Sequence, residues 1–228
     1  MKKTYLVVTA MQEEIDGLFE TVKPIDFGNG AYLYENDDFS VHAILGGIGK
    51  VNMAYRLGKF LAEISVNEIL NVGVAGSLSS KLQPLDTLLA TKCAYHDVDL
   101  KAFGYPLGQM SGEPLYFEAD KQGIEIGKTF PSSTIKEGLI LSGDQFITKQ
   151  NLPSFFFEDF DDPVACDMES AAVAQVAHEE KVPFMIIRSI SDDTSSNSNK
   201  EDYERRLKEA CRTAGKVAWY IIEHQVSK

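Results

Sequence analysis

Three charged side chains in the segment VACDMESAAVAQVAHEEKVPFMIIRSISDDT, residues 164–194, have the types and spacing for acid–base chemistry. Glu169 stands between a short apolar strand and a helix of small residues, whereas Arg188 and Asp192 follow a second apolar strand. In a parallel β-α-β unit both strands end at the same edge of the sheet, so we expect the three side chains to share one crevice. Arg188 needs a carboxylate partner if it is buried, and Glu169 is the partner we expect. That pair alone could be a structural ion pair.

Further carboxylates favour catalysis over support of the fold. Asp192 adds a third charge to the same edge, and Glu14 follows the first apolar strand at the turn into a helix. Taken alone, Glu14 also fits a first-turn acid that the helix dipole stabilises. Crowded carboxylates have pKa values pushed apart, so that one is protonated while another stays ionised. The pattern predicts acid–base chemistry at a leaving group, with a water molecule on the opposite face.

Composition limits the class of protein. A chain of 228 residues can form one large α/β domain with a substantial core. Its formal net charge of -12 argues against binding nucleic acid or an anionic membrane surface, and it contains no apolar run long enough to span a bilayer. The cysteines are odd in number and form no C-x-x-C motif, so we expect reduced core thiols in a cytoplasmic protein: Cys93, Cys166 and Cys211.

Apolar periodicity predicts alternating strands and helices. A strand at 5–9 precedes a hairpin at 27–45, which turns at 36–38. Further strands are expected at 68–72, 85–90, 138–142, 164–166 and 183–187, and helices from 13 onward, from 51 onward and at 124–130, 168–180 and 200–226. The phenylalanine-rich segment 151–160 is expected to pack under the sheet. The serine- and asparagine-rich segment 194–199 is expected to form a mobile lid.

Weaker motifs leave alternatives open. GGIGKVN at 46–52 could present backbone amides to an anion or a sugar hydroxyl, or could be a tight turn that needs positive φ, and it matches neither phosphate-loop pattern. A metal site is one interpretation of His96, Asp97 and Asp99. No further His or Cys lies near them at helical spacing, so we favour local hydrogen bonding in a loop over a metal site. Phe146 and Ile147 could stack on a flat ring or plug the core.

Several motifs together resemble the bacterial 5'-methylthioadenosine/S-adenosylhomocysteine nucleosidases of the purine nucleoside phosphorylase superfamily. They are AMQEE at 10–14, GGIGKVN, NVGVAGSL at 71–78, YHDVDLKAFGYPLGQ at 95–109, SGDQFI at 142–147, and the segment from DMES to SDDT at 167–194. The resemblance implies a single α/β domain over residues 1–228, with a mixed central β-sheet flanked by helices. It also implies a homodimer, no cofactor and no metal, and a place in methionine salvage.

The resemblance implies a role for each site residue. Asp192 would protonate N7 of adenine, Glu14 would position the attacking water, and Glu169 would hold the ribose hydroxyls, with Arg188 supporting the carboxylates. The substrate would also be contacted by Met11, Val74, Phe146, Ile147, Met168 and Ser191. The pocket for the 5'-alkylthio group would be lined by Tyr203 of the last helix and by Leu100 and Phe103 of the partner's loop. The expected reaction is hydrolysis of the N-glycosidic bond of 5'-methylthioadenosine and S-adenosylhomocysteine, with 5'-deoxyadenosine as a further candidate.

Two departures from the family's patterns bear on the nucleophile and on the site. Phosphorylases of the superfamily commonly hold phosphate with an arginine before the glycine turn and a hydroxyl inside it, where this chain has Asn71 and Val74. A phosphate dianion beside Glu14 and Glu169 would be disfavoured, so water is the predicted nucleophile. Many nucleosidases carry serine in place of Val74, and Asp167 is often a glutamate.

Two rival functions remain open at this stage. One is a sibling enzyme that shares the base and ribose contacts, either a nucleosidase for futalosine-type compounds or a phosphorylase. The other is a non-catalytic nucleoside-binding or storage protein on the same fold. The presence of Glu14, Glu169 and Asp192 argues against the non-catalytic protein, since a protein without catalytic activity has no need for three carboxylates at one site.

Overall fold

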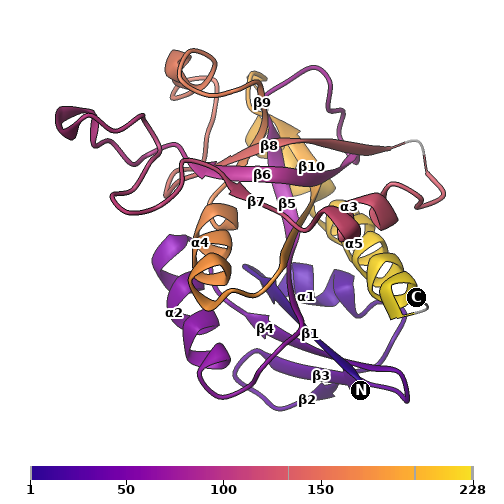
Figure 1. The fold of residues 1–228 in the computed structure, drawn as a ribbon. Helices are drawn as coiled ribbons and strands as arrows, with labels where there is room; N and C mark the ends of the chain where they lie inside the picture. Colours follow the sequence, from indigo (N-terminus) through magenta and orange to yellow (C-terminus); the bar gives the residue numbers. More distant parts are fainter. Residues whose placement is uncertain (1, 133, 198, 227–228) are drawn as a thin grey trace.

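A ten-stranded mixed sheet organises the described part of the chain (Figure 1). The computed structural model describes residues 2–132, 134–197 and 199–226. The strands are β1 (Lys3–Thr9), β2 (Ile25–Asp26), β3 (Ala31–Glu35), β4 (Phe39–Leu45), β5 (Glu68–Ser77), β6 (Thr87–Tyr95), β7 (Phe117–Glu118), β8 (Ile135–Ser142), β9 (Pro163–Asp167) and β10 (Phe184–Asp193).

Five of the strands close into a ring. The pairings run β5 to β10, β10 to β6, β6 to β8, β8 to β9 and β9 back to β5. Strand β1 pairs with the same edge of β5 as β9, nearer the start of β5, and β4, β3 and β2 follow outward from β1. Closure leaves none of these five strands with a free edge along the ring. Strand β5 is therefore central to the molecule, which explains why its sequence EILNVGVAGS is buried almost throughout.

Helices cover both faces of the sheet (Figure 1). They are α1 (Gln12–Leu18), α2 (Lys50–Leu61), α3 (Lys121–Gly127), α4 (Ser170–Glu180) and α5 (Asn199–Val226). Helices α2 and α4 lie on one side, and α1, α3 and α5 lie on the other. Small residues let α4 lie close to the sheet, because Ala171, Ala174 and Ala177 are completely buried.

A pair of glycines lets α1 cross α5 in contact. A Cβ on Gly17 would lie 2.6 Å from the backbone carbon of Cys211, and a Cβ on Gly215 would lie 2.6 Å from the carbonyl oxygen of Gly17. Backbone contacts this close exclude any side chain at either position. The crossing fixes the start of α1, and therefore Glu14, against the sheet.

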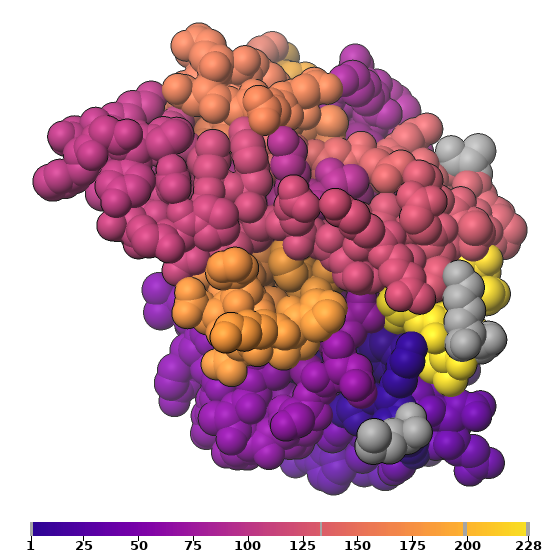
Figure 2. Space-filling view, in the orientation of Figure 1, coloured from indigo at the N-terminus to yellow at the C-terminus, as the bar shows by residue number. Residues whose placement is uncertain are grey.

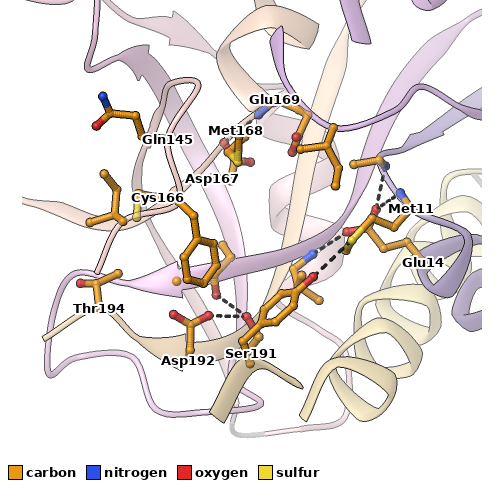
Figure 3. Close-up of a pocket in the computed structure, with 18 residues that line it drawn as sticks. Met11, Glu14, Gln145, Cys166, Asp167, Met168, Glu169, Ser191, Asp192 and Thr194 are labelled. Atoms are coloured by element: carbon orange, nitrogen blue, oxygen red, sulfur yellow. Dashed lines mark hydrogen bonds between the residues drawn. The ribbon is translucent and has the colours of Figure 1, made fainter. Parts of the chain in front are cut away.

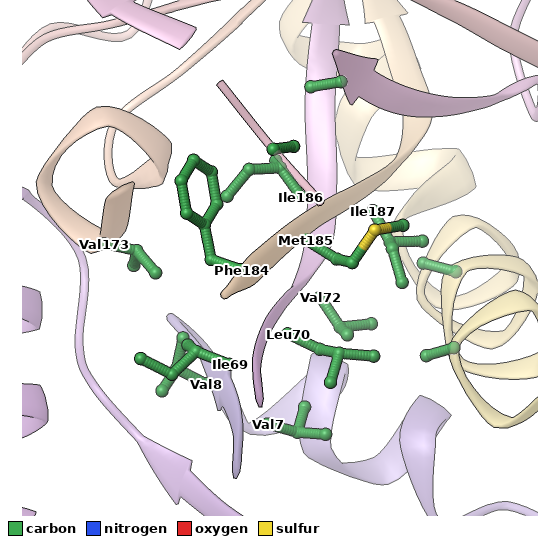
Figure 4. Packing of buried hydrophobic residues seen from close by; sticks show 14 of the residues in the cluster. Val7, Val8, Ile69, Leu70, Val72, Val173, Phe184, Met185, Ile186 and Ile187 are labelled. Atoms are coloured by element: carbon green, nitrogen blue, oxygen red, sulfur yellow. The ribbon is translucent and has the colours of Figure 1, made fainter. Parts of the chain in front are cut away.

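Branched apolar side chains of the central strands form the core (Figure 4). Val7 and Val8 of β1 pack with residues of β5 and β10 and with Val173 of α4. Burial of each such side chain contributes about 1.5–3 kcal/mol. The site described below rests on this rigid base.

The structure confirms most of the predicted elements. The hairpin is formed by the antiparallel strands β3 and β4, and the last helix spans Asn199–Val226. The segment 151–160 buries Phe156 and Phe160 in the expected way, although Phe157 is exposed. All three cysteines are buried free thiols.

The predicted parallel relation of the strands around α4 is wrong. Strand β10 runs parallel to β5, whereas β9 pairs antiparallel with β5 at Gly76 and Ser77. Strand β1 occupies that edge of β5 from Glu68 to Asn71, and β9 uses the part of the edge beyond it. The ends of β9 and β10 nevertheless meet, because Gly76 pairs with both Cys166 and Asp192.

Candidate active site

A pocket of about 180 Å³ opens where β5, β9 and β10 end (Figure 3). Of the residues expected at a site, ten line it: Met11, Glu14, Val74, Phe146, Ile147, Met168, Glu169, Ser191, Asp192 and Tyr203. Figure 3 shows Glu14, Glu169 and Asp192 on different sides of the cavity. Segments far apart in sequence thus converge on one concave site.

Glu14 is held rigidly by backbone amides. Its Oε2 accepts hydrogen bonds from the N–H groups of Ala10 at 2.7 Å and Met11 at 3.1 Å, and its Oε1 accepts one from Val74 at 3.1 Å. Burial raises the pKa of this carboxyl, while Arg188 and the amide donors lower it. Three fixed donors hold the carboxyl group in one orientation at the pocket.

Arg188 lies behind the pocket and is completely buried. The predicted pairing with Glu169 is wrong as the main contact: Nε donates to Asp167 Oδ2 at 2.8 Å, whereas Nη2 is 3.8 Å from Glu169 Oε2. Nη1 is 4.0 Å from Glu14 Oε1. Gly73 makes room for this cluster, because a Cβ there would lie 2.1 Å from Nη1 and 2.2 Å from Glu14 Oε1.

Asp167 is the main partner of Arg188, and no place in the site is predicted for it from the sequence. Besides Arg188, it accepts hydrogen bonds from Ser142 Oγ at 2.6 Å, from the N–H of Ser170 at 3.2 Å and from the Ser170 hydroxyl. Ser142 ends β8 and Ser170 begins α4, so Asp167 ties three elements to the arginine. The sequence signal that could identify Asp167 is its position as the last residue of a buried strand.

Glu169 precedes the first turn of α4 and faces the glycine turn. Its Oε1 accepts a hydrogen bond from the N–H of Gly49 at 2.9 Å. Burial, and next the neighbouring Asp167, raise the pKa of Glu169 to about 8, against the lowering effect of Arg188 and the Gly49 amide. Gly47 and Gly49 have φ of 87° and 91°, so the turn needs positive φ, and the amide of Gly49 meets a carboxylate of the protein.

Asp192 lies at a bulge near the end of β10. The Ser191 hydroxyl contacts Asp192 Oδ1 at 2.7 Å, and the carboxyl is 2 % exposed. Gly76 opposite it allows close approach, because a Cβ there would lie 3.3 Å from Asp192 Oδ2 and 2.9 Å from the Thr194 methyl carbon. Asp192 is therefore enclosed on the side of the pocket away from Glu14.

Apolar and aromatic side chains complete the walls. Phe146 and Tyr203 meet edge to face with ring centroids 5.7 Å apart, and the Tyr203 hydroxyl donates to Met11 Sδ at 3.2 Å. Phe146 is 43 % exposed at the pocket, whereas Ile147 is buried and packs into the core. Such a wall suits a flat ring and an apolar substituent.

Two segments differ from the roles expected of them at the pocket. Leu100 and Phe103 do not line this pocket, and Phe103 is 78 % exposed. Thr194 begins the segment expected to be a lid, but it is buried, and its N–H and hydroxyl both donate to the carbonyl of Ser77. It is a fixed part of the wall. Ser198 of the same segment lies outside the described residues.

The residues that the structure describes contain no cluster of three or more His, Cys, Asp or Glu side chains that could hold a metal ion. Asp97 instead pairs with Lys50. Among the helices that the structure describes, none is long and apolar enough to cross a membrane.

The arrangement can stabilise positive charge in a bound molecule. Four carboxyl side chains line the pocket, those of Glu14, Asp167, Glu169 and Asp192, and none of its described lining residues is lysine, arginine or histidine. A substrate that becomes cationic at its centre while its leaving group takes a proton would be favoured there.

Comparison with known proteins identifies the family. The family model of the phosphorylase superfamily matches residues 4–223. The 5'-methylthioadenosine/S-adenosylhomocysteine nucleosidase of Staphylococcus carnosus is 34% identical over 224 residues, which cover 95% of this chain and 98% of that protein. The chain belongs to this nucleosidase family of the phosphorylase superfamily. The resemblance of the motifs is confirmed.

Solved structures of the superfamily share the whole fold. The nucleosidase of Neisseria meningitidis in complex with methylthio-immucillin-A has a TM-score of 0.89 and is 35% identical, covering 97% of this chain and 99% of that chain. The futalosine hydrolase of Helicobacter pylori has a TM-score of 0.88 and 28% identity, covering 97% and 98%. The nucleosidase family therefore has a close structural neighbour with another substrate.

Proposed function

We propose that the protein hydrolyses the N-glycosidic bond of 5'-methylthioadenosine and S-adenosylhomocysteine, releasing adenine and the 5-thioribose. The observation that carries this proposal is the placement of Glu14, Glu169 and Asp192 around one pocket with apolar and aromatic walls. Full-length relatives that carry this nucleosidase name support the choice of substrate.

The proposed mechanism gives each carboxylate one task. Asp192, protonated, transfers its proton to N7 of adenine as the bond from the sugar to the base breaks, so the base leaves neutral. Glu14 accepts a proton from the attacking water, whose oxygen bonds to the anomeric carbon. Glu169 accepts hydrogen bonds from the ribose hydroxyls, and the negative charge of Glu14 stabilises the oxocarbenium-like state.

The charges around the pocket favour water over phosphate as the nucleophile. Arg188 is the cation nearest Glu14, and it is already within 4.0 Å of Glu14, Asp167 and Glu169. A phosphate dianion would enter a region where carboxylates outnumber this arginine. Val74 adds a side chain without a hydroxyl to the same wall.

Assembly into a homodimer in the cytoplasm belongs to the same proposal. The connection between β6 and β7 projects from the body of the molecule (Figures 1 and 2), and it carries the exposed Phe103. Val51 and Tyr55 of α2 are 77 % and 69 % exposed. We infer that Leu100 and Phe103 of each subunit complete the 5' end of the other's pocket. The free thiols fit a reducing compartment.

Release of adenine from 5'-methylthioadenosine in phosphate-free buffer tests the function. We expect multiple turnovers without phosphate, and parallel assays with S-adenosylhomocysteine, 5'-deoxyadenosine and futalosine rank the substrates by kcat/KM. Turnover that requires phosphate would mean a phosphorylase. A preference for futalosine would give the chain the activity of its Helicobacter neighbour, and binding without turnover would make it a binding protein.

A further inference from the structure

Lys50 joins two pocket-lining segments without lining the pocket itself. It is the first residue of α2, and its Nζ lies 2.6 Å from both carboxylate oxygens of Asp97, which follows β6. The same Nζ is 3.7 Å from Oδ2 of Asp144, which follows β8. The Lys50 and Asp97 side chains are 21% and 26% exposed, so water screens this pair only in part.

Backbone hydrogen bonds close the three residues into a ring. The N–H of Lys50 donates to Asp144 Oδ1 at 2.9 Å, and the N–H of Asp144 donates to Asp97 Oδ2 at 3.0 Å. The positive φ of Gly49 brings the turn against Asp144, since a Cβ there would lie 3.1 Å from Asp144 Oδ1. We call this ring of Lys50, Asp97 and Asp144 the clamp.

The clamp lies directly beside residues that form the pocket. Ile48 and Gly49 precede Lys50, and the Gly49 amide holds Glu169. Phe146 follows Asp144 by two residues. Ile48 and Phe146 are 51 % and 43 % exposed, so core packing does little to fix either side chain. Asn52 Nδ2 donates to the Ile48 carbonyl and Asn151 Nδ2 donates to the Phe146 carbonyl, and each of these hydrogen bonds lies within one segment. The clamp adds contacts that join the two segments to each other.

We propose that Lys50, Asp97 and Asp144 are positioning residues for nucleoside binding, which set the spacing between the Ile48 and Phe146 segments. This inference rests on the proposed function. Ile48 and Phe146 present apolar side chains and carry no group that takes part in proton transfer. Such walls bind the ground state and the transition state alike, so a change in their spacing alters KM more than kcat.

Matched substitutions test the clamp in the full-length protein. Lys50→Met keeps side-chain length and removes the charge, and Asp97→Asn removes the partner. Lys128→Met is the control, because Lys128 also contacts two carboxylates, Glu125 at 3.0 Å and Glu137 at 3.3 Å, away from the pocket. We expect KM for 5'-methylthioadenosine to rise about 5- to 10-fold in both clamp variants, the effect of one lost, partly buried ion pair, with kcat changed less than about 3-fold.

Two further variants distinguish loss of the Lys50–Asp97 contact from a general disturbance of the fold. Lys50→Arg keeps a charge that can pair with both oxygens of Asp97, so we expect it to recover most of the lost affinity. The double variant of Lys50→Met and Asp97→Asn should bind no more weakly than the worse single variant, because both remove one contact. KM values like those of Lys128→Met, or failure of Lys50→Arg to recover affinity, would overturn the proposal.

Backbone hydrogen exchange provides a readout that needs no substrate. In the unliganded protein, Lys50→Met should speed exchange in 46–50 and in 143–147 together, and Lys128→Met in neither. Faster exchange in only one segment would overturn the coupling that the clamp requires. An inactive wild-type protein would instead overturn the proposed function, and the exchange result would still decide whether Lys50 couples the two segments.

Discussion

Asp192 and Glu14 illustrate how single residues gain function from their surroundings. Both are nearly fully buried, but Glu14 receives three backbone amide hydrogen bonds whereas Asp192 faces a serine hydroxyl. Amide donors stabilise the ionised form of a carboxylate against the effect of burial, which suits the proposed role of Glu14 in orienting water. The different surroundings therefore agree with different roles for the two acids.

Asp192→Asn should retain the fold and lose most of kcat. The amide can still contact the Ser191 hydroxyl, but it cannot transfer a proton to the base, and general acid catalysis contributes about 10²- to 10⁴-fold. Steady-state kinetics at saturating 5'-methylthioadenosine measure the loss. Asp193→Asn is the matched control, because Asp193 is exposed and caps Ser195 instead of lining the pocket. Equal activity of the two variants would remove Asp192 from its role.

Glu169 should make stability depend on pH. Its pKa is raised to about 8 in the folded protein, against about 4.3 in an unfolded chain. Between these values the folded state keeps a proton that the unfolded state releases, so the contribution of Glu169 to stability falls as pH rises through this window. Relative to Glu169→Gln, the wild-type Tm should drop by about 5 °C or more from pH 5 to pH 8.

Exposed Glu180, at the other end of α4, provides the control for that measurement. The Tm difference between wild type and Glu180→Gln should stay constant over the same pH range, because an exposed side chain has the same aqueous surroundings in the folded and unfolded states. A constant difference for Glu169→Gln as well would contradict the raised pKa.

At the scale of elements, β5 determines how the charged groups fit together. Gly73 pairs in register with Arg188, and Gly76 pairs with both Cys166 and Asp192. The absence of side chains at these two positions leaves room for the carboxylates and the arginine. The site therefore requires glycine at these two positions of the NVGVAGSL motif, which is also one of the motifs that the family shares.

Gly73→Ala should destabilise the protein by about 2–3 kcal/mol, because its Cβ would overlap two buried side chains that have little room to move. Gly58→Ala is the control. No atom lies within 4 Å of a Cβ at Gly58, which is inside α2, so that variant should gain about 0.5–1 kcal/mol. Urea unfolding of both variants decides the comparison. A Gly73→Ala variant as stable as Gly58→Ala would mean that Glu14 and Arg188 can rearrange.

Sequence patterns predict individual elements better than the relations between them. Apolar runs and small residues marked β1, β5, β10 and α4, because local periodicity reflects burial. The direction of β9 relative to β10 depends on which edge of β5 remains open beyond β1, and no local pattern records that. The same limit applies to Asp167, whose pairing with Arg188 follows from the crossing of three strands and a helix.

At the scale of the whole molecule, one aromatic residue is exposed on the connection between β6 and β7. The fold of a single subunit gives no reason for its exposure. Phe103 is 78 % exposed and lies in a short 3-10 turn (Lys101–Phe103) outside its own pocket. A side chain of this size contributes little to an isolated subunit, but aromatic residues are enriched in subunit interfaces. The homodimer proposed above gives it a partner.

Phe103→Asp should therefore convert a dimer into a monomer and raise KM for 5'-methylthioadenosine. A charge buried in an apolar interface is costly, and the 5' end of each pocket would lose a wall. Light scattering after gel filtration measures the mass, and kinetics at the same concentration measure KM. Phe27→Asp is the control, because Phe27 is 62 % exposed on the part of the sheet that carries β2. A monomeric wild type, or a monomeric Phe103→Asp variant with unchanged KM, would show that each subunit binds its substrate alone.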